Sequence, residues 1–207
     1  MSSPISIAVR SPALLLAIFI AVLCISLHFA GLAEIWRFDR ESIASGAWYL
    51  LLTGNFAHLG SGHLGMNMAG FALIVALVWQ HFKAWEWAVV ILISSVFVGI
   101  GLYFRDPAIF WYVGFSGTLH GLIVAGCFAD LKHYPKSAAA LLVLVIGKLA
   151  WEQISGPLPG SEEVAGGKVV VNSHLYGAIG GAFAALILLG IRRRLQSDVR
   201  QSSHTPP

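Results

Sequence analysis

Ser116 and His174 are polar residues inside long apolar stretches of this sequence. A serine hydroxyl beside an imidazole is a nucleophile with its general base, the pairing that performs acyl transfer. Gly114-Phe-Ser-Gly117 would put the serine at or near a helix start, after a loop containing Pro107. Free backbone N–H groups at a helix start can hold an oxyanion, and the Gly117 N–H would be among them. These residues predict Ser116 as nucleophile and His174 as base.

Two further polar residues have the spacing expected of donors to the oxyanion. His63 and Asn67 are four residues apart, so on a helix they share one face and their side chains can donate to the same oxyanion. His120 lies one turn after Ser116, where it can pack under His174 or hydrogen-bond to it. We find no Asp or Glu placed to orient His174, and therefore expect a Ser-His dyad.

Lys148 and Glu152 have their own interpretation. They are four residues apart, which predicts an ion pair near the outer end of a helix. Intramembrane ionisable residues are costly and are either functional or tightly paired. We expect this pair to satisfy itself. We likewise expect His58 to be a structural hydrogen-bonding group in an outer loop.

The composition indicates that these residues lie inside a membrane. The chain has 207 residues, 57% of them hydrophobic and 11% charged, and its mean hydropathy is +0.77. Soluble domains carry roughly 25% charged residues, so an ordinary soluble enzyme, a disordered chain and a nucleic-acid module are excluded. The net charge of +3 includes four arginines between residues 192 and 200, which is a membrane-orientation signal. Cys24 and Cys127 lie in apolar runs and are expected to be free core residues.

The elements that must position the polar residues are apolar helices. A spanning helix needs about 20 mostly apolar residues. The sequence predicts an all-α membrane protein: a segment 1–10, a six-helix membrane domain over 11–192, and a tail over 193–207. The first span is too long for a signal-peptide core, so we keep it as a helix. The predicted spans are 12–32, 63–79, 87–104, 110–129, 137–151 and 169–191.

The distribution of Lys and Arg predicts how the chain is oriented in the membrane. With the N-terminus inside, eight of these residues fall on the inner side and four on the outer side, so both termini are predicted to be cytoplasmic. Segments 33–62 and 152–168 are then outside. The first mixes charge with aromatics, as in a structure at the outer interface. The second is rich in Gly and Pro and predicts a mobile loop, which with Trp151 is a candidate gate for a substrate helix.

Depth brings three of the polar residues to one level. At about 1.5 Å per helical residue, Ser116 and Asn67 lie about 24 Å, and His174 about 27 Å, above the inner edge. Small residues also recur every four positions on the fourth and sixth spans, which lets two helix backbones approach closely. If these stripes face each other, Ser116 and His174 come within hydrogen-bond reach. The stripes are Gly117, Gly121 and Ala125, and Gly177, Gly181 and Ala185.

The combination resembles the rhomboid intramembrane serine proteases. The matching elements are His63-Leu-Gly-Met-Asn67, Gly114-Phe-Ser-Gly117 and His174-Leu-Tyr-Gly-Ala-Ile-Gly-Gly181, in order on the second, fourth and sixth spans, within about residues 45–192. The resemblance implies a six-helix rhomboid-like bundle. It also implies Ser116 as nucleophile, His174 as base, and His63 with Asn67 in the oxyanion hole.

One departure narrows the resemblance. Many rhomboids carry a tyrosine stacked on the catalytic histidine, whereas this chain has His120, in Gly-Phe-Ser-Gly-Thr-Leu-His120-Gly121. This spacing is similar to the rhombosortase branch. That similarity implies a bacterial inner-membrane enzyme with its site open to the periplasm. Its substrates would be exported proteins with a C-terminal sorting tail made of a Gly-rich motif, a transmembrane helix and a basic end. The implied chemistry needs no cofactor or metal.

Two other functions remain open at this point. A non-catalytic rhomboid-like protein would bind transmembrane clients, although such proteins usually lack the serine or the histidine. A metal-binding membrane protein or transporter would use His63, His120 and His174, since three neutral imidazoles can ligate zinc. Against it, no carboxylate joins them, no His-Glu-x-x-His string exists and no inverted repeat is visible. The sequence assigns no nucleic-acid partner, and the substrate's scissile bond, the acyl acceptor and the oligomeric state are not assigned.

Overall fold

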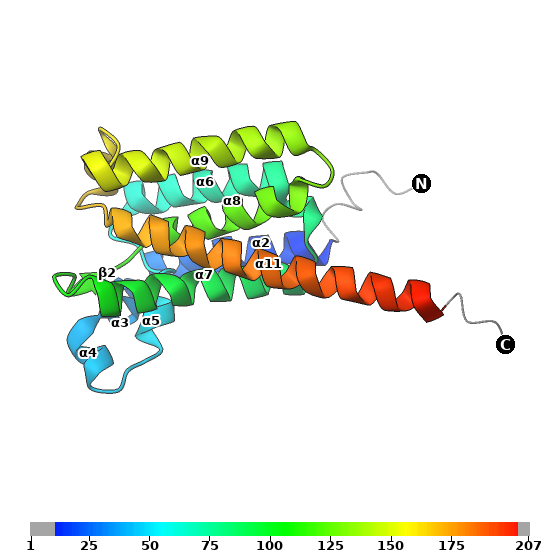
Figure 1. Cartoon of the computed structure of the whole chain (residues 1–207). Coiled ribbons are helices and arrows are strands. Elements are labelled where there is room, and N and C mark those ends of the chain that lie inside the picture. The colour runs from blue at the N-terminus through cyan, green and yellow to red at the C-terminus, as the bar shows by residue number, and fades with distance from the viewer. Residues whose placement is uncertain (1–10, 203–207) are drawn as a thin grey trace, which may run out of the picture.

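The structure, a computed structural model, describes residues 11–202, with side chains through 197. The predicted segment 1–10 and residues 203–207 of the predicted tail lie outside the described residues. Long helices run side by side as a bundle, and α2 begins at the same end of it at which α11 ends (Figure 1). These helices are α2 (Pro12–Phe29), α6 (Ser61–Val78), α7 (Ala84–Arg105), α8 (Ser116–Asp130), α9 (Pro135–Ser155) and α11 (Val171–Ser202).

Five of these helices are long and apolar enough to cross a membrane. The exception is α8, which has 15 residues. The six-span count therefore stays a prediction. The predicted span 110–129 is wrong in its first six residues. Trp111–Tyr112 instead forms a strand, β2, and Gly114 has a φ of +135° that does not fit a helix. At the other end of the chain, α11 runs eleven residues past the predicted boundary at Ile191.

Short elements cover the end of the bundle that carries Ser116. The segment predicted to lie at the outer interface folds into short pieces: α3 (Ala33–Trp36), β1 (Phe38–Asp39), α4 (Arg40–Ala44) and α5 (Leu50–Thr53). β1 pairs antiparallel with β2, Phe38 opposite Tyr112. The segment 152–168 was predicted as a loop, but α9 continues to Ser155 and α10 (Ser161–Ala165) follows. A 3₁₀ turn, η1 (Trp79–His81), follows α6.

The helix that carries Ser116 lies in the middle of the bundle. Twelve of the fifteen residues of α8 are buried, and it packs against α6, α7, α9 and α11. The small-residue stripes of α8 and α11 face each other: a Cβ on Gly177 would meet the carbonyl of Gly117, and one on Gly181 the carbonyl of Gly121. Glycine at these positions therefore lets the two backbones come into contact.

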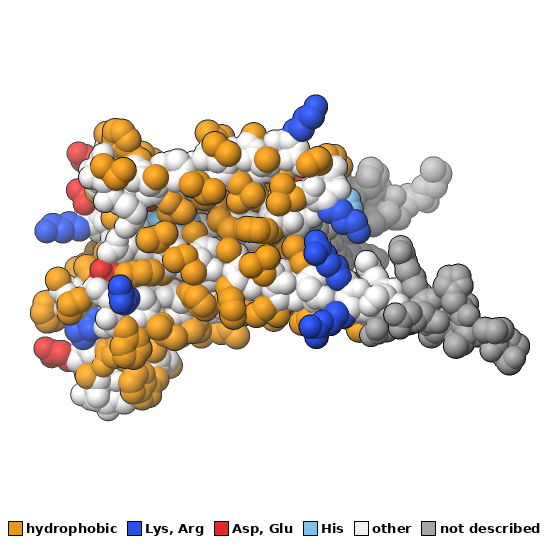
Figure 2. Space-filling view, in the orientation of Figure 1, with side chains coloured by type: hydrophobic (Ala, Val, Ile, Leu, Met, Phe, Trp, Pro, Cys, Tyr) orange, Lys and Arg blue, Asp and Glu red, His pale blue; other side chains and the backbone are white. Residues whose placement is uncertain are grey.

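The surface of the bundle is that of a membrane protein. In the face shown by Figure 2, hydrophobic side chains cover the middle of the helices and the charged side chains gather toward the two ends. Exposed apolar residues of the long helices include Leu144 and Ile146 on α9 and Ile187 on α11. Cys24 and Cys127 are free and fully buried, which confirms the prediction for both.

Candidate active site

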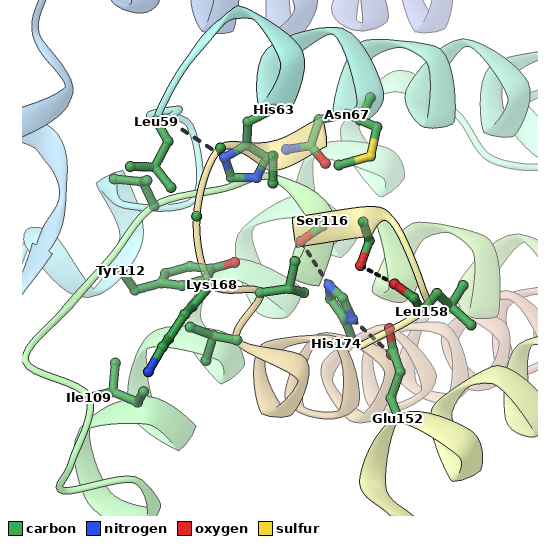
Figure 3. Close-up of a pocket in the computed structure, with 18 of the residues that line it drawn as sticks. Leu59, His63, Asn67, Ile109, Tyr112, Ser116, Glu152, Leu158, Lys168 and His174 are labelled. Atoms are coloured by element: carbon green, nitrogen blue, oxygen red, sulfur yellow. Dashed lines mark hydrogen bonds and ion pairs between the residues drawn. The ribbon is translucent and has the colours of Figure 1, made fainter. Parts of the chain in front are cut away.

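Ser116 is the first residue of α8, and His174 lies in the first turn of α11. Because the glycine stripes bring these two helices together, the side chains meet. Ser116 Oγ lies 2.9 Å from His174 Nε2, within the reach that a nucleophile needs of its base. Figure 3 shows the two side chains pointing toward each other across the space between their helices. His174 is buried.

The expectation that no acid orients His174 is wrong. Glu152 reaches from α9, and its Oε2 lies 2.9 Å from His174 Nδ1. The carboxylate accepts only, so Nδ1 carries the proton and Nε2 is left to accept from Ser116. This is the geometry of a nucleophile, a base and an orienting acid in line. Where the sequence predicts a Ser-His pair alone, the structure adds Glu152 as the hydrogen-bond partner of His174.

The sequence hides the contact of Glu152 with His174, because the spacing pairs Glu152 with Lys148. That ion pair is present, with Lys148 Nζ 2.6 Å from Glu152 Oε1, so the prediction of the pair is confirmed. A carboxylate, however, has two oxygens, and Oε1 and Oε2 serve different partners. The signal that the sequence offered was position: Glu152 lies near the outer end of α9, at the end of the bundle where α8 and α11 begin.

His120 stacks on His174. The two rings are 4.3 Å apart between centroids and 20° from parallel. His120 Nδ1 lies 2.7 Å from the carbonyl oxygen of Ser116, and its Nε2 lies 3.0 Å from Lys148 Nζ. His120 thus occupies the face of the base, and its polar contacts are to the Ser116 backbone and to Lys148.

His63 and Asn67 lie on α6. In Figure 3, Ser116 is seen between this pair and His174. Both side chains are buried, and the Asn67 Nδ2 amide has no hydrogen-bond partner among the described residues. The Leu59 N–H donates to His63 Nδ1 at 3.5 Å, which places the His63 proton on Nε2. Two donors, Asn67 Nδ2 and His63 Nε2, therefore remain to be satisfied by something that enters the cavity.

Gly114 makes room for His63. Its φ of +135° lies in a region that L side chains rarely adopt, and a Cβ there would be 2.8 Å from His63 Cε1 and Nε2. Its carbonyl accepts a 2.7 Å hydrogen bond from the Tyr112 phenol. Burial raises the pKa of Tyr112 to about 12, so the phenol stays a donor. Gly117, whose N–H was predicted to face the oxyanion, lies in the first turn of α8 with its Cα side against Ser173.

A buried polar network holds the first turn of α8 in place. Thr118 Oγ1 lies 2.8 Å from Ser95 Oγ and donates to Asn55 Oδ1 at 3.1 Å. Asn55 Nδ2 donates in turn to the Ser95 carbonyl at 3.2 Å. Since each of these groups is buried, breaking one would leave the others unpaired. The network thereby fixes α8 to α7 and to the segment after α5.

Arg40 holds the segment that leads to Ser116. Its guanidinium donates to the carbonyls of Leu102 and Tyr103 at the end of α7, and to those of Asp106 and Ile109 beyond it. Four carbonyls satisfied by one cation make the turn after α7 rigid. This cluster and its role were not predicted from the sequence, because the partners are backbone atoms.

These residues border one cavity of about 630 Å³. It is large enough for a peptide segment. Apolar side chains from the 108–113 segment, from α6 and from the 165–170 segment make up much of the wall, and the polar groups converge where Ser116 lies. The cavity is lined by Ser116, His174, Glu152, His63, Asn67, His120 and Lys148, with Met66, Ile109, Leu158 and Val169 among the others.

His58 lies in the loop before α6. It is buried and packs edge-on against His63, with the ring centroids 5.2 Å apart. Burial, together with the positive charge that a protonated His63 or His28 would carry, lowers the pKa of His58 to about 3. Neither ring nitrogen has a partner among the described residues, so the prediction that His58 is a structural hydrogen-bonding group is not supported.

The three histidines proposed as zinc ligands are not brought together as one group. Among the described residues, the metal-ligand atoms that lie within 4.8 Å of one another belong to His120, Glu152 and His174. His63 is not a member of this group. A Lys148 ammonium already bonds two of its members, His120 and Glu152.

Comparison with known proteins finds a matching family model. The family model described as the rhomboid domain matches residues 45–191, which contain Ser116 and the six polar or charged residues described above, His63, Asn67, His120, Lys148, Glu152 and His174. No curated protein matches the chain significantly.

Proposed function

The chain belongs to the rhomboid family, and from that premise we propose that it is an intramembrane serine endopeptidase with a Ser116–His174–Glu152 triad. The observation that carries the proposal is the alignment of three groups from three helices, with 2.9 Å from Ser116 Oγ to His174 Nε2 and 2.9 Å from His174 Nδ1 to Glu152 Oε2. The Ser116 hydroxyl can donate to His174 Nε2 while His174 Nδ1–H donates to Glu152 Oε2. The base can therefore take the proton of the nucleophile while the acid holds its ring.

The reaction follows from these contacts. Ser116 Oγ attacks the carbonyl carbon of the scissile bond while His174 Nε2 takes the hydroxyl proton. Glu152 stabilises the imidazolium that forms, without itself taking the proton. His174 then gives the proton to the leaving amine as the carbon–nitrogen bond breaks, which leaves an acyl ester on Ser116. Water, or another amine in a sortase-like variant, takes the acyl group and restores the serine.

The negative charge of the intermediate needs donors. Asn67 Nδ2 and His63 Nε2 are the unsatisfied donors on the side of Ser116 that faces α6, and the N–H groups of Ser116 and Gly117 belong to the first turn of α8. Donors fixed before the reaction are worth more in a site shielded from water than in solution.

We further propose the substrate class and the setting that the rhombosortase resemblance implies. The substrate is an exported protein with a Gly-rich motif, a transmembrane helix and a basic end, cut near the outer face of a bacterial inner membrane. Glycine lowers the cost of unwinding a substrate helix because it has low helix propensity. The cavity is lined by Ser116 and His174 at the starts of α8 and α11, whereas Arg192, Arg193 and Arg194 lie in the later part of α11, which supports an opening on the periplasmic side if those arginines are cytoplasmic.

The test is covalent labelling of the purified protein by a fluorophosphonate, a probe that reacts with activated serines. Wild type is expected to be labelled, and Ser116→Ala and His174→Ala are expected to lose labelling while they keep the wild-type unfolding temperature. Ser42→Ala, at an exposed serine of α4, is the matched control and should label like wild type. A folded wild type that no fluorophosphonate labels would refute the protease and favour a non-catalytic rhomboid-like protein.

The substrate proposal has its own assay. A reporter with a Gly-rich motif, a transmembrane helix and a basic end is reconstituted with the enzyme in liposomes and its cleavage is followed. Replacing the glycines by valine should slow cleavage, since valine neither unwinds a helix as easily nor leaves the backbone as accessible. Equal cleavage of both reporters would contradict the Gly-rich specificity and would leave the protease proposal standing.

A further inference from the structure

Lys148 lies on α9, one turn before Glu152, and reaches into the active site. Its Nζ is 2.6 Å from Glu152 Oε1 and 3.0 Å from His120 Nε2. The triad described above does not use it. A lysine inside a membrane helix is expensive, and this one is aimed at two groups that contact the nucleophile and its base.

The donors and acceptors around Lys148 fit in only one arrangement. The Ser116 carbonyl can only accept, so the proton of a neutral His120 ring is on Nδ1 and its Nε2 accepts from the Lys148 ammonium. The same ammonium donates to Glu152, which accepts from His174, which accepts from the Ser116 hydroxyl. The chain of hydrogen bonds begins at the backbone of Ser116 and returns to its side chain.

The burial of Glu152 also requires a nearby positive charge. The Glu152 side chain is only 2% exposed, whereas that of Lys148 is 32% exposed. A buried carboxylate without a partner is strongly destabilised in its ionised form. Lys148 is the one cation bonded to Glu152 among the described residues, and its partly exposed head keeps contact with water. Lys148 therefore adds to the His174 Nδ1–H bond in keeping ionised the carboxylate that orients His174.

Packing adds a mechanical reason. The only buried residues of α9 are Ala138, Leu149 and Glu152, while Val143, Leu144 and Ile146 are exposed. With few buried apolar side chains on α9, the polar bonds from Lys148 and Glu152 to His120 and His174 add to the packing of Leu149 in holding the outer half of α9 to α8 and α11. The same two side chains thus aim the triad acid and help to position α9.

We propose that Lys148 is a positioning residue that keeps the Glu152 carboxylate ionised and aimed at His174. This role rests on the proposed function, because it acts through the triad. It predicts that Lys148 matters to the reaction rate only while residue 152 is a carboxylate.

The first experiment measures fluorophosphonate labelling rates of single variants of the full chain. Lys148→Met removes the charge and keeps the length, and should lower the rate at least about tenfold, the worth of a hydrogen bond to a charged group. Lys148→Arg keeps the charge and should retain most of the rate. Lys136→Met, at an exposed lysine of the same helix, is the matched control and should label as wild type does. Unfolding temperatures identify any variant that does not fold, and Lys148→Gln then replaces Lys148→Met.

The second experiment repeats Lys148→Met in a Glu152→Gln background. A glutamine that keeps its oxygen on His174 Nδ1–H must turn its NH₂ toward the Lys148 ammonium, donor against donor. Removing the ammonium there should leave the labelling rate unchanged or raise it. Equal losses in both backgrounds would mean that Lys148 acts on the fold and not through Glu152, and would overturn the proposal.

The outcomes separate the two proposals. No labelling of wild type refutes the protease. Labelling of wild type with an equal rate in Lys148→Met refutes the role of Lys148 alone. A loss in the wild-type background that vanishes or reverses in the Glu152→Gln background, with recovery in Lys148→Arg, supports it.

Discussion

Glu152→Gln tests the acid of the triad with the smallest change of shape. The amide can turn its oxygen toward only one of the two partners of the carboxylate. With the oxygen on His174 Nδ1–H, its NH₂ opposes Lys148, 2.6 Å from Oε1 in the present structure. With the oxygen on Lys148, its NH₂ opposes His174, and the imidazole proton must move to Nε2, where it blocks the proton transfer from Ser116.

The two orientations bracket the expected loss. If Lys148 swings aside and His174 keeps its tautomer, the loss is that of a charge-assisted hydrogen bond, about 1.5–3 kcal/mol or roughly 10- to 150-fold in rate. If the wrong tautomer dominates, the loss approaches the roughly 10⁴-fold seen when a triad carboxylate becomes an amide. We expect about 10²- to 10⁴-fold, because Lys148 is only partly exposed and moves at the cost of its bond to His120.

The assay is the rate of fluorophosphonate labelling, followed by gel fluorescence, with reporter cleavage in liposomes beside it. Glu163→Gln, at an exposed glutamate of α10, is the control for loss of one negative charge at the same end of the molecule. A Glu152→Gln variant that folds and labels within about twofold of wild type would show that the carboxylate does not orient the base, since a lost charged hydrogen bond must exceed that.

The remaining predictions concern the backbone contacts and the histidine loop. Gly181→Leu should lower the free energy of unfolding by about 1–3 kcal/mol or more, because its side chain would enter the backbone of α8; Gly190→Leu, where a Cβ meets nothing within 4 Å, should leave the unfolding temperature unchanged or raise it slightly through helix propensity. Gly114→Ala should slow labelling by roughly 10- to 1,000-fold, because its Cβ would displace His63, 2.8 Å away; a normal labelling rate would contradict the assignment of that imidazole to the oxyanion. Because burial lowers the pKa of His58 to about 3, its contribution to stability is present above pH ~6.5 and is lost as pH falls toward 3. His58→Gln should therefore lose about 2–3 kcal/mol less than wild type between pH 7.5 and 4.5, and parallel melting curves of the two proteins would refute this.

The sequence predicts that Ser116 and His174 meet, and the structure confirms this contact. Intramembrane polar residues are few, helical rise turns their positions into depths, and small-residue stripes mark the helices that touch. These three signals do not depend on side-chain conformation.

The rest of the site depends on conformation and is not visible in this way. Glu152 appears satisfied by its neighbour on the same helix, and only the rotamer shows that its second oxygen serves His174. The start of α8 at Ser116 is also hidden, because hydropathy runs unbroken through Phe110–Phe115 while the turn depends on Gly114 and on the pairing of β2 with β1. Arg40 bonds backbone carbonyls, which leave no mark in the sequence.

The shortness of α8 sets the depth in the membrane at which Ser116 lies. Fifteen residues make a helix of about 22 Å, about 8 Å less than the hydrocarbon thickness of roughly 30 Å. The lipid meets the longer helices around it, whereas the reacting atoms stand at the height where α8 begins. The peptide bond of a client that is cut is then the one that lies at this depth below the membrane surface. Lengthening the apolar helix of the client by one residue should therefore move the cut by one residue. Selection by depth would act together with the preference for a Gly-rich motif proposed above.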